Sequence, residues 1–294
     1  MTATQAFAVE MHGEVLAGPV RRPHNAFQSA KGSIHDDATA NKLGFRGGTV
    51  AGNVHFEQFP PLMEALFGEA WHRTGGLSLY FLHATIDGEP VQAFARRIAS
   101  PTPTLQRAEV WMEGESGVRI CEGTANVGGD DSDSALKTRL KSVRPATDLR
   151  MLADRRVGDT VSAIPSRLRR SETDPRLEGI TEPLAAYQDA SIFGERVAAP
   201  SVAIDALRVV EQPMFKPRGP YVGMFGAIEL QFLGGPIFVE HDYVADGKIL
   251  ALSDSPKTEM TWYESTLKDA KGGQAVARMI LLSRLLKGSS PLWD

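Results

Sequence analysis

The most informative stretch of the sequence is residues 32–52, which read Gly32-Ser-Ile-His-Asp-Asp-Ala-Thr-Ala-Asn-Lys-Leu-Gly-Phe-Arg-Gly-Gly-Thr-Val-Ala-Gly52. A histidine, His35, is followed at once by Asp36 and Asp37. Imidazole and carboxylate groups are the side chains that most often move protons in enzymes. The stretch ends on Gly52, and a glycine permits close approach of a ligand to the backbone. It is therefore a candidate site segment.

Apolar residues downstream of this stretch repeat with the period of an α-helix. One face of the predicted helix carries Phe59, Leu62, Met63, Leu66 and Phe67. A single apolar stripe is typical of a helix that packs on a core. Pro60 and Pro61 are expected to begin or kink this helix, because proline is not accommodated in a straight helix interior. The stripe predicts a core helix packed under a sheet.

Strand and turn signals follow the predicted helix. Residues 107–113 are strand-like, residues 114–117 (Gly-Glu-Ser-Gly) have turn chemistry, and residues 118–127 form a second strand-like run. Two such runs separated by a short glycine-containing turn predict an antiparallel hairpin.

A comparable series occurs near the C-terminus. Residues 227–232 alternate strictly between apolar and polar, Gly234-Gly235 interrupts them, and residues 237–244 resume the strand pattern. Asp246-Gly247 predicts a turn into residues 248–252, and residues 258–267 follow as another strand. Residues 274–287 fit either a buried strand or a helix, because periodicity does not distinguish these for a short apolar run.

The chain is predicted to consist of two units, residues 1–145 and 146–294. Its 294 residues, 42% of them hydrophobic, are enough for two ordinary globular domains. Residues 128–134 (Gly-Gly-Asp-Asp-Ser-Asp-Ser) are rich in small and acidic side chains, which predicts an exposed turn or linker. Residues 157–164 then alternate like a new first strand, so the boundary is expected between about 128 and 156.

The segment from Ile34 to Gly52 resembles the hydratase motif of the MaoC-like and R-specific enoyl-CoA hydratase family. In that motif an apolar residue precedes a catalytic histidine and an Asp follows two residues later. A run of Ala, Gly and an aromatic residue then leads to a glycine at the head of the central helix. The matching positions here are Ile34, His35, Asp37, Ala40, Gly44-Phe45 and Gly52.

The second half contains a weaker echo of the same motif. Tyr187-x-Asp189 pairs with His35-x-Asp37, and residues 197–200 parallel residues 49–52. Together with the two sets of predicted hairpins, these echoes indicate a diverged internal repeat.

The resemblance implies a fold and a chemistry. The fold is α+β, with two fused hot-dog units, each an antiparallel sheet wrapped around a central helix. The chemistry is hydration or dehydration of an acyl thioester, carried by coenzyme A or an acyl carrier, without a cofactor or a metal. By resemblance, His35 is the general base or acid, Asp36 or Asp37 orients it, and Gly52 is the oxyanion donor. Gly48, Tyr187 and Asp189 are assigned to substrate binding. Hot-dog units pair, so a homodimer is also expected.

The sequence departs from the motif at three positions. Ala30 stands five residues before His35, where the family carries an Asp, and Ala51 replaces the histidine before the helix glycine. Tyr187 replaces the catalytic histidine in the second half. An alternative therefore stays open, in which the chain binds acyl thioesters as a catalytically silent or scaffold subunit. A third possibility is thioester hydrolysis with Asp36, Asp37 or Glu57 as the carboxylate.

Structural explanations are also open for the candidate residues. Asp37 and Asp189 could cap the short helices that follow them, because Asp is a preferred N-cap residue. His35 could be a loop histidine satisfied by a neighbouring carboxylate. His55-x-Glu57 has the spacing of a weak metal pair.

Composition excludes several classes of partner. The formal net charge of −4 offers no general attraction to nucleic acid or to an anionic membrane. The longest apolar runs are too short to span a bilayer, and the N-terminus does not read as a signal peptide. Cys121 is the one cysteine, so an intrachain disulfide is impossible. These features predict a cytoplasmic protein.

Overall fold

The structure is a computed structural model that describes residues 9–188 and 191–294. Its strands are β1 (Glu10–His12), β2 (Val15–Ala17), β3 (Gly76–Phe81), β4 (Val91–Ile98), β5 (Gln106–Gly114), β6 (Arg119–Val127), β7 (Thr160–Ser166), β8 (Gly223–Phe232), β9 (Tyr243–Asp254), β10 (Thr258–Asp269) and β11 (Ala275–Leu286). Its α-helices are α1 (Asp37–Lys42), α2 (Gly52–Phe56), α3 (Pro60–Phe67), α4 (Ala70–Thr74), α5 (Ala135–Leu140), α6 (Arg170–Leu177), α7 (Pro200–Arg208) and α8 (Glu211–Met214). Short 3₁₀ turns cover Ala185–Tyr187, Lys287–Ser289 and Pro291–Trp293.

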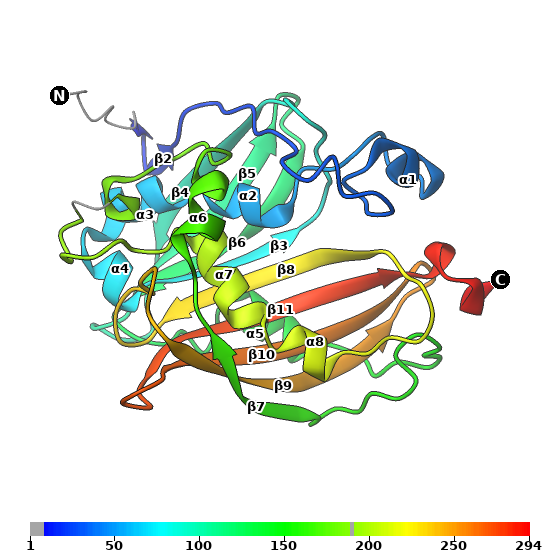
Figure 1. Ribbon diagram of the computed structural model, residues 1–294. Coiled ribbons are helices and arrows are strands. Elements are labelled where there is room, and N and C mark those ends of the chain that lie inside the picture. The colour runs from blue at the N-terminus through cyan, green and yellow to red at the C-terminus, as the bar shows by residue number, and fades with distance from the viewer. Residues whose placement is uncertain (1–8, 189–190) are drawn as a thin grey trace.

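The strands of the described residues form one antiparallel sheet in the order β1-β2-β4-β5-β6-β3-β8-β11-β10-β9-β7. The two halves of the chain meet where β3 pairs with β8, from Gly76 opposite Gln231 to Tyr80 opposite Ala227. In Figure 1 the sheet curves around the helices. Helices α2 and α3 lie beside the strands of the N-terminal half, and α7 lies across the concave face of the C-terminal half. This confirms the predicted α+β arrangement of antiparallel sheet around central helices.

One continuous core joins the two halves. The buried cluster includes Phe59 and Leu77 from the N-terminal half and Val202 and Leu281 from the C-terminal half. Alternation sets which side chains enter it, because successive side chains of a strand point to opposite faces. In β5, for instance, Ala108, Val110 and Met112 are buried, and their neighbours along the strand are more exposed. The predicted core helix is α3, and its two prolines stand in the first turn.

The hydrogen bonds around α2 and α7 repeat in the two halves. Backbone N–H groups of Thr49 and Val50 donate to the carbonyl oxygens of Ile34 and Thr85. In the second half those of Val197 and Ala198 donate to Ala186 and Ile237. Thr49 also pairs with Ile86, and Val197 pairs with Phe238, through isolated β-bridges. The matching connections place His35 and Tyr187, and likewise Gly52 and Pro200, at equivalent positions of the repeat.

Two sequence predictions differ from the structure, and one alternative that the sequence left open is decided by it. Residues 237–242 are not a strand, because this segment crosses past the start of α7, where Phe238 bridges Val197. Asp246-Gly247 is not a turn and lies within β9. A Cβ on Gly247 would lie 2.9 Å from Cβ of Val210, so the glycine permits close packing there. Residues 274–287 resolve to a strand, β11.

The predicted linker is also more ordered than its composition suggests. Asp131 is buried, and its carboxylate accepts a 2.7 Å hydrogen bond from Nε of Arg107. Ser134 is buried as well and caps α5 by accepting from the N–H of Lys137. The prediction of an exposed turn was wrong at these two residues because each polar side chain finds a partner inside the fold.

Candidate functional site

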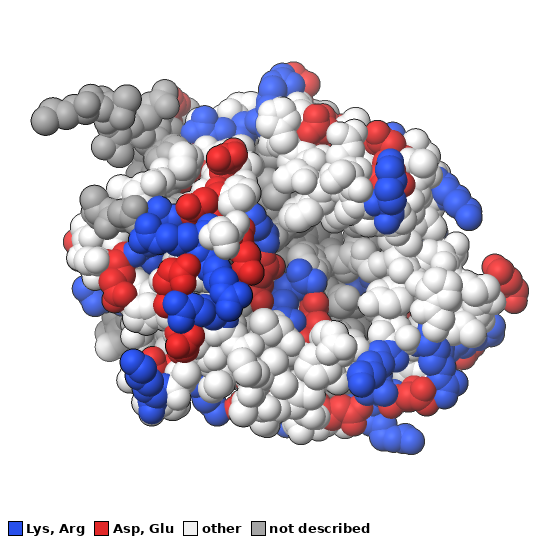
Figure 2. Space-filling view, in the orientation of Figure 1, with Lys and Arg blue, Asp and Glu red and all other residues white. Residues whose placement is uncertain are grey.

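A cavity of about 690 Å³ lies between the two halves of the chain. Figure 2 shows it as a hollow that contains both basic and acidic side chains. Its N-terminal wall includes Phe27, Ala30, Ile34, His35, Thr49–Asn53, His55 and Phe81–Thr85. Its C-terminal wall includes Arg176, Asp205, Arg208, Glu211, Gln212, Phe215, Tyr221, Gly223–Phe225, Ser283 and Arg284.

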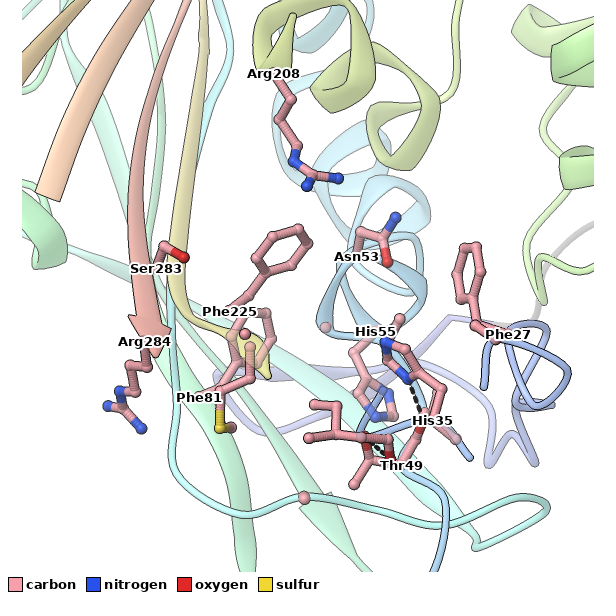
Figure 3. A pocket seen from close by; sticks show the side chains of 18 of the residues that line it. Phe27, His35, Thr49, Asn53, His55, Phe81, Arg208, Phe225, Ser283 and Arg284 are labelled. Carbon is pink, nitrogen blue, oxygen red and sulfur yellow. Dashed lines mark hydrogen bonds between the residues drawn. The ribbon is translucent and has the colours of Figure 1, made fainter. Parts of the chain in front are cut away.

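His35 lies in this cavity with its ring orientation set by the backbone. Its Nδ1 is 2.7 Å from the carbonyl oxygen of Thr49 (Figure 3). A carbonyl oxygen only accepts hydrogen bonds, so in the neutral ring Nδ1 carries the proton and Nε2 has the lone pair. Within the described residues Nε2 makes no hydrogen bond. The ring also contacts Phe27, with 5.4 Å between ring centroids. His35 therefore has the tautomer that a general base needs.

Asp36 is a helix cap, and within the described residues its carboxylate makes no hydrogen bond to the His35 ring. Its carboxylate accepts from the N–H and hydroxyl of Thr39, at 3.3 and 2.7 Å, and from Nζ of Lys31 at 3.0 Å. The bonds from Thr39 and Lys31 lower the pKa of Asp36 to about 2. Capping was expected of Asp37, but the cap of α1 is the preceding residue, because Asp37 already has a helical position.

Asp37 holds the glycine pair Gly47-Gly48 in place next to the backbone of His35. Its Oδ1 accepts a 2.7 Å hydrogen bond from the N–H of Gly48, and its Oδ2 accepts from Nε2 of Gln28 at 3.3 Å. A Cβ on Gly48 would lie 2.3 Å from the carbonyl oxygen of His35, so only glycine fits there. Gly48 and Asp37 are not among the residues that line the cavity.

Gly52 begins α2 and lines the cavity beside His35. The N–H groups in the first turn of a helix have no intrahelical acceptor. Ala30 also lines the cavity, so a methyl group occupies the place where the resemblance leads one to expect a carboxylate.

In the second half, the residue equivalent to His35 lies outside the cavity. Tyr187 is 1% exposed, and burial together with the Glu57 carboxylate raises the pKa of its phenol well above the ordinary value. Asp189, which was assigned to substrate binding with it, lies outside the described residues. The two halves of the repeat therefore have different environments: open at His35 and closed at Tyr187.

In the second half, the space next to Tyr187 and the start of α7 is occupied by Glu57, a residue of the first half. Oε1 of Glu57 accepts a hydrogen bond from the backbone N–H of Ser201, the second residue of α7. Glu57 is fully buried, and this burial raises the pKa of its carboxyl group to about 7. An oxygen of a protein side chain thus occupies the space in front of α7 that is equivalent to the cavity in front of α2.

We expect Glu57→Gln to change how stability depends on pH. The pKa of Glu57 is raised in the folded chain. The contribution of its protonated form to folding stability is therefore fully present below about pH 4.5 and is lost as pH rises through 7. Glutamine does not titrate, so the variant should be more stable than wild type at pH 8, by up to about 3 kcal/mol, and similar at pH 5. Urea unfolding at both pH values measures this. The exposed control Glu14→Gln should keep the wild-type difference in stability between pH 5 and pH 8. A Glu57→Gln variant whose stability depends on pH as that of wild type does would show that the Glu57 carboxyl does not have a raised pKa.

Residues of α6, α7 and α8 supply charged groups that were not predicted from the sequence. Arg176 forms an ion pair with Asp205, and its guanidinium carbon lies 5.7 Å from the centre of the Phe27 ring. Arg208 forms a bidentate pair with Glu211, at 3.1 and 2.7 Å. Burial and the charge of Arg208 lower the pKa of Arg176. Each arginine faces the cavity with a carboxylate beside it, so the charges of the four side chains cancel.

His55 and Glu57 do not form a metal pair. Nε2 of His55 lies 2.7 Å from the hydroxyl of Thr85, whereas Glu57 is directed to α7. Burial lowers the pKa of His55 to about 4, so its ring is neutral. Within residues 9–188 and 191–294, no group of three or more His, Cys, Asp or Glu side chains is arranged to hold a metal ion. The described helices also include none with the length and apolar character needed to cross a membrane.

Comparison with known proteins identifies the class of fold. A solved structure described as a MaoC domain protein dehydratase from Chloroflexus aurantiacus superposes on this chain with a TM-score of 0.61 at 13% identity, covering 97% of this chain and 99% of that one. A conserved hypothetical protein of Mycobacterium tuberculosis, described as a double hot-dog fold, gives 0.62 at 11% identity, with coverages of 94% and 97%. A MaoC-like dehydratase gives 0.56 at 13% identity, with coverages of 93% and 97%.

These comparisons show that the chain has a double hot-dog fold, which confirms the predicted fold class. At this level of identity the likeness concerns the fold. No family model matches the sequence, and no curated protein matches it.

Proposed function

We propose that the chain is an acyl-thioester hydratase or dehydratase of the MaoC-like type, with its active site in the cavity at His35. The observation that carries the proposal is the geometry of His35: Nδ1 donates to the Thr49 carbonyl, and Nε2 has no hydrogen bond within the described residues, in a cavity formed by both halves. A general base must present its lone pair to the substrate region.

The second half supports the proposed position of the thioester oxygen. There the carboxylate oxygen of Glu57 accepts from the N–H of Ser201, in the first turn of α7. The equivalent residue in the first half is Asn53, which follows Gly52 in α2 and lines the cavity. A developing negative charge is stabilised at such a place by free N–H groups and the helix dipole. Gly52 and Asn53 would therefore bind the thioester carbonyl.

The proposed reaction adds water across the C2=C3 double bond of an enoyl thioester. Nε2 of His35 takes a proton from water, and the hydroxyl oxygen forms a bond to C3. The π electrons move to the thioester oxygen as an enolate, which is held by the N–H groups of α2. The enolate then takes the proton at C2 from the His35 imidazolium. Dehydration is the same sequence in reverse. We propose coenzyme A or an acyl carrier as the thioester carrier, a homodimer as the assembly and the cytoplasm as the location.

One observation favours a second candidate, a silent subunit that binds acyl thioesters. Ala30 lines the cavity where the resemblance places an acid, and within the described residues neither Asp36 nor Asp37 makes a hydrogen bond to the His35 ring. In this alternative the cavity binds the ligand but lacks a second proton-transfer group.

Turnover of enoyl thioesters by the wild-type chain tests the proposal. Incubation with crotonyl-CoA and longer enoyl thioesters is expected to remove the enoyl-thioester absorbance band without release of free thiol. Loss of the band with stoichiometric thiol release would instead indicate hydrolysis. Saturable binding with an unchanged band would favour the silent subunit. Neither binding nor turnover across a broad panel of enoyl and 3-hydroxyacyl thioesters would refute both candidates.

A further inference from the structure

Arg284 of β11 is a cation in the cavity wall without a carboxylate partner. Among the described residues the wall includes three arginines, and the other two, Arg176 and Arg208, are each paired with an acidic side chain. Arg284 is partly buried, and within residues 9–188 and 191–294 it forms no ion pair. A charge that is partly removed from water is destabilising until it is paired. An anionic group on a ligand would supply the partner.

The guanidinium of Arg284 is held in one orientation by its neighbours. Its Nη2 donates a 2.7 Å hydrogen bond to the hydroxyl of Tyr80, and its Cζ lies 5.3 Å from the centre of the Tyr80 ring. Gly226, which is unpaired in a bulge between β8 and β11, makes room for the side chain, since a Cβ there would lie 2.5 Å from Nε of Arg284. Within the described residues, Nη1 makes no hydrogen bond. The group is therefore oriented before a ligand binds, which lowers the entropy cost of binding.

Arg284 lies where the strands of the two halves separate. The pairing of β3 with β8 ends at Tyr80 opposite Ala227. Beyond this pair, residues 81–85 of the first half and residues 223–225 of the second half line the cavity. The hydrogen bond from Arg284 to Tyr80 thus places the cation beside the opening between the two halves of the sheet.

Apolar side chains separate Arg284 from His35. In Figure 3, Phe81 and Phe225 lie between the two residues in this view. Both phenylalanines line the cavity, as does Met224. A ligand that reaches from His35 to Arg284 therefore needs a reactive end, an apolar middle part and an anionic group. A thioester can carry this group at either end, as a carboxylate that ends the acyl chain or as a phosphate of the carrier.

We propose that Arg284 binds an anionic group of the thioester ligand, a carboxylate of the acyl chain or a phosphate of the carrier. Oxygens of both groups form short, charge-assisted hydrogen bonds with a guanidinium. Arg284 is then a binding residue that determines which thioesters the cavity accepts, and it takes no part in the proton transfers. This inference rests on the proposed acyl-thioester function.

The test compares Arg284→Met with Arg139→Met. Methionine removes the charge and keeps much of the length of the side chain. Arg139 is the matched control: its guanidinium also stacks on Tyr80, with Cζ 4.0 Å from the ring centre, but it pairs with Glu122 and does not line the cavity.

Three saturated thioesters, which cannot be hydrated, serve as ligands, and calorimetry measures their Kd. Hexanoyl-N-acetylcysteamine carries no anionic group. Adipoyl-N-acetylcysteamine adds a carboxylate at the end of the acyl chain, and hexanoyl-CoA adds the phosphates of the carrier. Comparison of the three separates the two sources of negative charge.

Arg284→Met is expected to bind at least one of the two anionic thioesters about 10–100-fold more weakly than wild type does, the scale for a hydrogen bond to a charged group. A loss with the adipoyl compound identifies a carboxylate, and a loss with hexanoyl-CoA identifies a phosphate. Affinity for the uncharged thioester should not change, and Arg139→Met should bind all three as wild type does. Arg284→Lys, which keeps the charge, should retain more of the affinity than Arg284→Met.

Unchanged Kd values of Arg284→Met for both anionic thioesters would overturn the inference. An equal loss with the uncharged thioester, or an equal loss in Arg139→Met, would also overturn it, because the effect would then be one of cavity shape. A selective loss in a chain that does not turn over enoyl thioesters would support the anion site and refute the hydratase proposal. Turnover by wild type together with unchanged binding in Arg284→Met would refute the anion site alone. Failure of wild type to bind any thioester would refute both.

Discussion

Replacement of His35 by alanine is expected to lower kcat for hydration of an enoyl thioester by about 10²–10⁴-fold, the range for loss of a general acid–base group. The reason is the loss of Nε2, which carries the lone pair of the neutral ring when Nδ1 donates to the Thr49 carbonyl. Substrate binding should change much less, because the cavity walls and the first turn of α2 remain. The measurement is the rate at which the enoyl band disappears, with Kd determined separately by calorimetry.

His24→Ala is the matched control. His24 is exposed, lies 3.3 Å from the carboxylate of Asp87, and is not among the residues of the cavity wall. It should retain wild-type kcat. If His35→Ala keeps activity within about threefold of wild type, His35 is not the general base. Hydration would then need a different proton-transfer group among the residues of the cavity.

Replacement of Glu259 by glutamine is expected to destabilise the fold by about 3 kcal/mol, a large part of the ordinary 5–15 kcal/mol stability of a globular protein. Glu259 is fully buried and accepts hydrogen bonds from the backbone N–H groups of Arg150, Met151 and Leu152, at 2.9, 2.9 and 2.8 Å. Nε1 of Trp293 adds a fourth at 2.7 Å. Even with its oxygen in the place of Oε1, a glutamine would set its NH₂ group against the N–H of Leu152, which donates to Oε2 in the wild type.

Urea unfolding measures this effect, and Glu264→Gln is a control on the same strand. Glu264 is partly exposed and lies 3.6 Å from Arg278, a contact worth at most about 1 kcal/mol. A Glu259→Gln variant as stable as Glu264→Gln would show that the segment 150–152 and the C-terminal Trp293 are not held by this carboxylate.

Predictions succeeded where the signal was local. The hairpin at residues 107–127 is β5 and β6, and the apolar stripe ahead of it is α3. Both depend on side-chain periodicity and turn residues, which neighbouring residues specify. The turn predicted at Asp246-Gly247 failed because a glycine was interpreted through its turn preference, whereas its reason lies in the close approach of Val210.

Part of the candidate site could be found from the sequence for the same reason. His35, Gly52 and the start of α2 belong to one short segment whose order of residue types resembles a known motif, and the structure brings them to one cavity. Asn53 was missed, although it follows Gly52 directly. Its proposed role rests on its equivalence to Ser201, whose backbone N–H donates to Glu57, and a contact between residues so far apart in the chain cannot be deduced from the sequence.

The amino-acid sequence determines the repeating units of this protein: strands that alternate, helices with one apolar face and a histidine-bearing segment ahead of the first central helix. The opposite wall of the cavity, with Arg176, Asp205, Arg208 and Glu211, comes from helices about 140 residues or more away in the chain from His35. The contrast between an open site at His35 and a closed one at Tyr187 also arises only in the tertiary structure, because Glu57 of the first half accepts a hydrogen bond from α7. These features depend on long-range packing of one half against the other, which local residue preferences do not specify.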